Sequence, residues 1–122
     1  MAHPSFKLYL EENNLYVMGP GRAALLRAIE ELGSLNKAAQ KQGMSYRWAW
    51  GRIRDAEKAL GIPLLQPSGQ PGMGNTKVLT PQARELLAWL TNMETQIQSV
   101  LNTALATRPA FLRLPGKHSD TA

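Results

Sequence analysis

The amino-acid sequence predicts a mainly α-helical domain with two small β-hairpins. Apolar residues recur at helical spacing in several segments that begin at capping residues and end at glycine. A glycine-rich loop separates two short apolar runs, which is typical of a hairpin. The last periodic segment is longer than the others and carries an apolar seam. With 122 residues, 43% of them hydrophobic, the chain is large enough to form one core.

The first hairpin is expected over residues 6–17. Residues 6–10 begin with alternating apolar and polar side chains, and residues 15–17 are apolar, which suits two short strands. Glu12-Asn13-Asn14 forms the turn between them. Gly19-Pro20-Gly21 interrupts the pattern, so the hairpin ends there.

Two helices are expected next, with a minimal connection between them. The first covers residues 22–32, and its apolar face comprises Leu25, Ala28, Ile29 and Leu32. Gly33 is placed to end this helix as a left-handed cap. Ser34 can cap a second helix of about two turns, which ends at Gly43.

A third, longer helix is expected over residues 46–60, from a capping Ser45 to Gly61. Its core face comprises Tyr46, Ala49, Trp50, Ile53, Ala56 and Leu60. The opposite face is polar and mostly basic, with Arg47, Trp48, Gly51, Arg52, Arg54, Asp55 and Lys58. A short helix, a turn with glycine and a basic helix form a helix-turn-helix, whose basic face suits a major groove.

Trp48 is unusual on an outward face, and two interpretations stay open. Its ring contacts a thymine methyl group or a sugar, or it packs on the tip of the second helix or on a partner. Gly51 costs roughly 1 kcal/mol in a helix interior relative to alanine. Close approach of the helix to DNA or to another backbone would explain it.

The second hairpin is expected from Leu64-Leu65 and Lys77-Val78-Leu79, around the loop at residues 67–75. This loop has three interpretations. It is a wing that lies along phosphates through Lys77 and backbone amides, a flexible hairpin tip, or a nucleotide site. The nucleotide site is the weakest, because Asn75 stands where a phosphate loop requires lysine.

The last helix is expected over residues 81–105, after a Thr80 cap and Pro81. Its apolar residues are spaced three and four apart over about three heptads, which predicts a coiled-coil seam. We expect a dimer interface formed by Leu86, Leu90, Met93, Ile97, Val100 and Ala104. The prediction is one domain over residues 1–107, followed by a flexible tail over residues 108–122.

The net charge of +5 is concentrated in one part of the chain. Residues 33–80 contain seven basic and two acidic side chains, and the remainder contains seven of each. Such a one-sided field is typical of a phosphate-binding surface, although a solvated basic face explains it equally well. The chain has no cysteine, which excludes disulfides and thiolate chemistry and suits a cytoplasmic location.

The helix-turn-helix segment resembles the N-terminal DNA-binding domain of the ModE family of molybdate-responsive regulators, and more distantly the LysR-type regulators. The most specific part of the resemblance is the run Ser45-Tyr46-Arg47-Trp48-Ala49-Trp50. Residues 22–39, Leu64-Leu65, the glycine-rich loop, Val78-Leu79-Thr80 and the long helix extend it over about residues 6–105.

This resemblance implies a winged helix-turn-helix with a long C-terminal dimerisation helix. It also implies homodimers that bind palindromic DNA and pair through the first and last helices. Family members carry C-terminal domains that bind molybdate, which we expect this chain to lack. Leu65-Gln66-Pro67 and the loop after it depart from the family pattern, so the wing contacts and target sequence should differ.

Three alternatives were weighed against a DNA-binding regulator. An enzyme is disfavoured, because the two histidines, His3 and His118, lie near the termini and the only aspartates are Asp55 and Asp120. An interaction module would heterodimerise with a full-length regulator through the same seam. An oxyanion sensor would use helix N-termini and the glycine-rich loop.

The sequence therefore predicts a homodimer that binds double-stranded DNA, with no cofactor, no metal and no membrane. The candidate DNA-binding residues lie in the second helix, the third helix and the second hairpin: Ser34, Asn36, Lys37, Lys41, Ser45, Arg47, Trp48, Arg52, Arg54, Lys58 and Lys77. We expect Lys37, Lys41, Arg54, Lys58 and Lys77 to contact phosphates and the others to position the helix or read bases.

Overall fold

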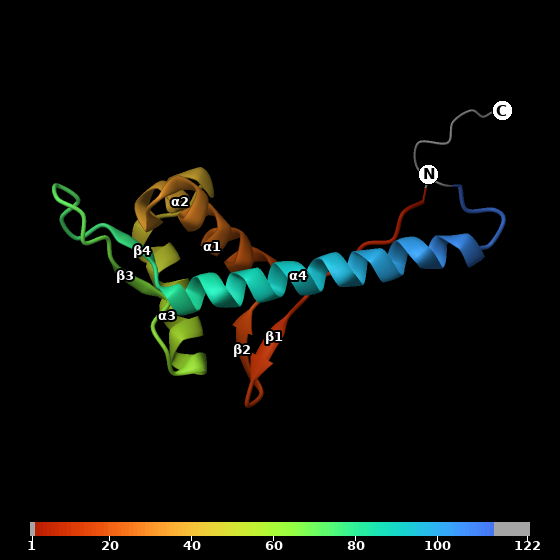
Figure 1. Cartoon of the computed structure of the whole chain (residues 1–122), viewed down its shortest axis with the longest axis horizontal. Helices are drawn as coiled ribbons and strands as arrows, with labels where there is room; N and C mark the ends of the chain where they lie inside the picture. The colour runs from red at the N-terminus through yellow and green to blue at the C-terminus, as the bar shows by residue number, and fades with distance from the viewer. Residues whose placement is uncertain (1, 114–122) are drawn as a thin grey trace.

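A computed structural model describes residues 2–113 of the chain (Figure 1). The elements are β1 (Leu10–Glu12), β2 (Leu15–Met18), α1 (Pro20–Leu32), α2 (Leu35–Lys41), α3 (Tyr46–Leu60), β3 (Leu65–Pro67), β4 (Lys77–Leu79), α4 (Pro81–Ala104) and a 3-10 turn (Leu105–Thr107). β1 pairs with β2 and β3 pairs with β4, both antiparallel. The winged helix-turn-helix and the long last helix are confirmed.

Short-range hydrogen bonds set the helix boundaries, as the sequence predicts. Ser34, Ser45 and Thr80 precede α2, α3 and α4, and each hydroxyl accepts a hydrogen bond from the N–H group three residues later, at 3.1 Å. Gly33 and Gly61 follow α1 and α3 with φ angles of 88° and 75°, a conformation that favours glycine. α1 differs slightly: it begins at Pro20 rather than Arg22, because proline suits the first position of a helix.

The first hairpin is shorter than expected. β1 begins at Leu10 rather than Phe6, and the turn is formed by Asn13 and Asn14, whose φ angles are 51° and 65°. Two consecutive positive φ angles match the twist of a tight hairpin, and asparagine adopts them more readily than most residues. Residues 4–9 are extended and alternate between half-buried and exposed side chains, but they lie outside both sheets.

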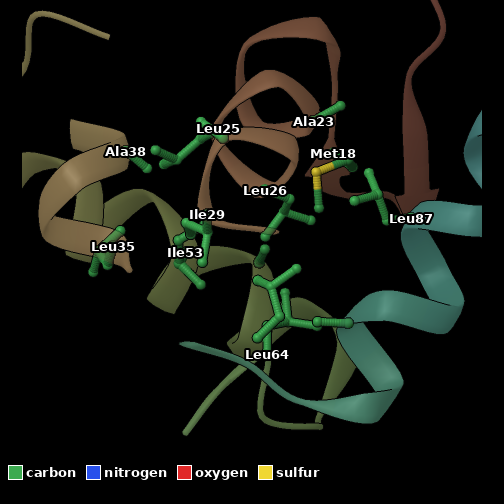
Figure 2. Close-up of a cluster of buried hydrophobic side chains, with 14 of the residues drawn as sticks. Met18, Ala23, Leu25, Leu26, Ile29, Leu35, Ala38, Ile53, Leu64 and Leu87 are labelled. Carbon is green, nitrogen blue, oxygen red and sulfur yellow. The ribbon is translucent and has the colours of Figure 1, made fainter. Parts of the chain in front are cut away.

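The core lies where β2, α1, α2, α3, the second hairpin and the start of α4 meet. Figure 2 shows side chains from β2, the helices and the segment before β3 pointing toward one another. Its largest fully buried side chains are Val17, Met18, Leu25, Leu26, Ile29, Leu35, Ile53, Leu64 and Leu79. α1 crosses the middle of this cluster and packs against α2 most extensively. Burial of this face holds the two short helices in place, since a helix of two turns is not stable alone.

The predicted core face of α3 is partly wrong. Ala49, Ile53 and Ala56 are buried, but Tyr46 and Trp50 are about 42% and 41% exposed, and Leu60 is half-buried. Glu57 takes an unexpected buried place beside Ala56. α3 is therefore buried along a narrow stripe, which packs against β2, α2 and α1.

α4 begins against the core and then extends away from the rest of the domain (Figure 1). Ala83, Leu87 and Leu90 are buried near its start. At its far end, Ala2 donates a backbone hydrogen bond to Arg113, at 2.8 Å. The expected tail therefore begins beside the N-terminal segment, and residues 114–122 lie outside the described residues. None of the helices in the described part is long and apolar enough to cross a membrane.

Candidate nucleic-acid interface

The first turns of α3 present the most exposed part of the predicted reading face. Ser45 and Arg47 are exposed, and Trp48 is 61% exposed, so its ring is not packed into the tip of α2. Arg52, one turn later, is half-buried. The Ser45 cap and the buried Ala49 and Ile53 fix the helix, so these side chains project from a rigid support.

The basic residues of α3 differ in how they are neutralised. Arg54 donates to Glu57 at 3.1 Å and lies over the ring of Trp50, 5.2 Å from its centroid. Arg47 and Lys58 form no ion pair among residues 2–113. Arg47 and Lys58 are therefore exposed cations that no carboxylate of the described residues neutralises.

α2 contributes a smaller part of the surface. Ser34 is buried and its hydroxyl caps the helix, so it positions α2. Asn36 and Lys37 are exposed in the first turn, where the helix end favours anions. Lys41, at the other end, forms an exposed ion pair with Glu31 at 3.0 Å.

The wing is attached to α3 by Glu57, which the sequence analysis missed. One carboxylate oxygen accepts hydrogen bonds from the N–H groups of Leu64 and Leu65, at 2.7 and 3.2 Å. The chain therefore turns directly from α3 into β3 at a fixed angle. Lys77 lies half-buried in β4, at the base of the loop. No spacing pattern marks Glu57, because its partners are backbone groups after the helix.

Arg22 is a second residue that the sequence analysis missed. Its side chain is only 10% exposed, yet it lies beside α3. It donates to the carbonyl oxygen of Val17 at 3.0 Å, stacks on the ring of Tyr16 at 4.4 Å and lies 3.8 Å from Asp55. These contacts join the first hairpin, α1 and α3, and they add one fixed positive charge to the edge of the reading face.

The predicted seam on α4 separates into two parts. Leu90 is 3% exposed and belongs to the core of its own chain, so it leaves little surface for a partner. Leu86, Met93 and Ile97 are half-buried. Val100 and Ala104 are exposed, as is Trp89 on the neighbouring face. Coiled-coil spacing continues past the point where the core ends. Periodicity alone therefore does not separate residues that pack in the core from residues that could pair with a second helix.

The described residues contain no group of three histidine, cysteine, aspartate or glutamate side chains that could hold a metal ion. On α3, Arg54, Asp55 and Glu57 engage in ion pairs, and Arg54 also stacks on Trp50. The chemistry of this surface is that of charged and aromatic recognition.

Residues 22–84 match the family model described as bacterial regulatory helix-turn-helix protein, lysR family. This stretch runs from the buried Arg22 through α3 and the wing to the first turn of α4. The match therefore covers the helices and the hairpin that make up the candidate interface.

Several curated proteins are similar to the same part of the chain. The molybdenum-pterin-binding protein MopB of Rhodobacter capsulatus is 35% identical over 88 residues, 70% of this chain and 32% of MopB. The molybdenum transport protein ModE of Herbaspirillum seropedicae is 44% identical over 66 residues, 53% of this chain and 24% of that protein. The transcriptional regulator ModE of Haemophilus influenzae is 30% identical over 87 residues, 71% of this chain and 34% of that protein.

The aligned part thus spans between a quarter and a third of these relatives' length. The resemblance to the ModE family is confirmed for the DNA-binding part. Together with the fold, the exposed basic helix and the family match, it leads to one conclusion. The chain belongs to the lysR family of bacterial regulatory helix-turn-helix proteins.

Proposed function

We propose that two copies of this chain pair through α4 and place their α3 helices in successive major grooves of double-stranded DNA. The observation that carries the proposal is the exposed start of α3, where Arg47 and Trp48 project from a capped and buried helix. An arginine fork matches the two acceptors on a guanine edge, and an indole suits a thymine methyl group or a sugar. Two such helices in a dimer lie about one DNA turn apart, roughly 34 Å.

The phosphate contacts in this proposal come from Lys37, Lys58, Lys77, Lys41 and Arg54. Lys37 and Lys58 are exposed, and Lys77 lies at the base of the wing. Lys41 and Arg54 are each held by a glutamate, so their contribution to the field is smaller. Asn36, Ser45 and Arg52 complete the proposed DNA-binding surface. They either hold the recognition helix in position or contact the groove.

Pairing through α4 is supported by the shape of the helix. It extends beyond the core that covers its first turns, and Ile97, Val100 and Ala104 remain on the extension (Figure 1). A row of apolar side chains at spacings of three and four is stable in water when a second helix covers it. The same row supports a second candidate function, in which the chain pairs with a longer relative and modulates it.

The test is fluorescence anisotropy with the 122-residue chain and no added effector. A duplex enriched from a random library by this protein is compared with a scrambled duplex of equal length over a range of salt concentrations. We expect preference for the enriched duplex, with affinity that falls steeply as salt rises. Failure to enrich any sequence, or equal weak binding to the enriched and scrambled duplexes, would contradict the first function and favour the second.

A further inference from the structure

A pocket of about 420 Å³ opens between the start of α1 and the exposed face of α3. We name it the arginine pocket, and its lining includes Arg22, Arg47, Arg52, Ser45, Trp48 and Asp55. Three guanidinium groups thus face one carboxylate, and Asp55 already pairs with Arg22. The lining keeps a positive charge after that pairing, in a space large enough for a small ligand.

Two arginine nitrogens at the pocket lack an acceptor. The Nε atoms of Arg22 and Arg52 are buried and have no hydrogen-bond partner among the described residues. A buried donor without a partner destabilises the folded state, more so when it carries charge, so native proteins rarely leave one unsatisfied. Both arginines line the pocket, and a small shift of either side chain would bring its buried donor to an acceptor bound there.

The backbone at the start of α1 adds to this geometry. Gly21 lies in the first turn of α1, and a Cβ atom on it would be 2.9 Å from an Nη atom of Arg52. The glycine thus allows the guanidinium of Arg52 to lie directly on the helix end. That end has no acidic residue in its first turn and no side-chain cap, and the positive end of a helix favours anions.

The ligand is limited by the donors that are present. Guanidinium groups and the hydroxyl of Ser45 donate hydrogen bonds, and arginine forks match the oxygens of a phosphate. The contacts of Arg22 with Val17 and Tyr16 hold its positive charge in place before any ligand arrives. The pocket also lies on the face of α3 that carries Arg47 and Trp48, which the proposed function turns toward DNA.

We propose that the arginine pocket is a site for a tetrahedral oxyanion, and that its occupant in the DNA complex is one backbone phosphate per protomer. The second half of this inference rests on the proposed function. A free oxyanion carries the same chemistry, so the experiment has one arm for each source.

The first arm uses inorganic phosphate and no DNA. Phosphate replaces chloride at constant ionic strength, and the indole N–H signal of Trp48, assigned with a Trp48→Phe variant, is followed by NMR. We expect a saturable shift in the unmodified chain. Arg52→Gln should weaken the phosphate affinity about tenfold, because a charge-assisted pair of hydrogen bonds is lost.

Two further variants test whether phosphate binding depends on the position of the Arg52 guanidinium or only on the overall charge of the protein. Gly21→Ala leaves the charge unchanged but pushes the guanidinium of Arg52 away, so it should also weaken phosphate binding. Arg84→Gln is the control: it removes one positive charge on α4, from an exposed ion pair with Glu30. We expect this control to bind phosphate as the unmodified chain does. Thermal melting monitors the fold of every variant.

The second arm measures the salt dependence of binding to a duplex by anisotropy. Each phosphate contact contributes about 0.9 to the slope of log affinity against log salt. We expect Arg52→Gln to reduce this slope by about one per protomer and Arg84→Gln to leave it unchanged.

The outcomes are distinct. Shifts of Trp48 that are absent, or equal in all variants, overturn the oxyanion site even if the protein binds DNA. Suppose that Arg52→Gln abolishes the shift of the Trp48 signal with phosphate but leaves the salt slope of DNA binding unchanged. This result would overturn the DNA phosphate as the occupant and assign the pocket to a free oxyanion. If the unmodified chain binds no DNA, the proposed function fails, while the phosphate arm still decides whether the pocket binds an oxyanion.

Discussion

We expect recognition of the DNA sequence to depend most strongly on Arg47. It is exposed on the first turn of α3, and no carboxylate among residues 2–113 pairs with it, so its fork is free for a base. We expect Arg47→Ala to weaken binding to an enriched duplex by about 1–3 kcal/mol, while binding to a scrambled duplex changes far less. Lys58→Ala is the comparison, and it should weaken binding to the enriched and the scrambled duplex equally. An equal loss on both duplexes for Arg47→Ala would place Arg47 among the phosphate contacts.

Glu57 carries a structural role at the same scale. Its removal leaves the buried N–H of Leu64 without an acceptor, so Glu57→Ala should lower the free energy of unfolding by about 1–3 kcal/mol. Glu57→Gln retains a carbonyl oxygen that can accept from that N–H, so it should lower the free energy of unfolding by less. Urea denaturation followed by circular dichroism measures both. Equal stability of the alanine variant and the unmodified chain would mean that the wing is held by other contacts.

At the scale of the element, α3 combines a stable helix with an open reading face. Gly51 lies in its middle, and a Cβ atom there would have nothing within 4 Å. Gly51→Ala should therefore stabilise the free protein by about 1 kcal/mol, because glycine is a poor helix former. We expect the same variant to bind DNA more weakly, since Gly51 lines the arginine pocket and faces the groove. Thermal melting and anisotropy give the two values, and unchanged DNA affinity would show that the glycine serves no close approach.

At the scale of the whole molecule, α4 connects the fold to assembly. Val100 is 68% exposed in the single chain, so a charge there leaves the core intact but disrupts an apolar seam. We expect Val100→Asp to halve the molar mass measured by light scattering. Gln96→Asp, on an exposed position one turn earlier, is the matched control and should remain dimeric. Leu90 is unsuitable for this test because it lies in the core. A Val100→Asp protein with unchanged mass would contradict pairing through this part of α4.

In the proposed dimer, assembly and DNA binding are coupled. Two recognition helices on one dimer would bind two half-sites together, so loss of the dimer would remove the affinity gained by linking them. The Val100→Asp variant should therefore keep its fold and lose most of its affinity for an enriched duplex. The loss would come from the absence of the second copy, and not from the removal of a contact between Val100 and DNA.

The amino-acid sequence alone determined the order and ends of the helices. Ser34, Ser45 and Thr80 bond to N–H groups three residues away, and Gly33 adopts an angle that few other residues reach. These are interactions within a few residues, so they can be predicted without knowledge of the fold. The basic character of α3 was predictable for the same reason, since it follows from helical spacing.

The tertiary structure decided which side chains are buried and which meet. Leu90 lies in the core and Val100 does not, although both fit one heptad pattern, because the domain covers only the first turns of α4. Trp50 is half exposed although it shares a face with Ile53, since no element covers it. Arg22 and Arg52 are 30 positions apart and line one pocket only after α1 packs beside α3. Burial and charge pairing depend on contacts between distant segments, and local periodicity carries no information about those contacts.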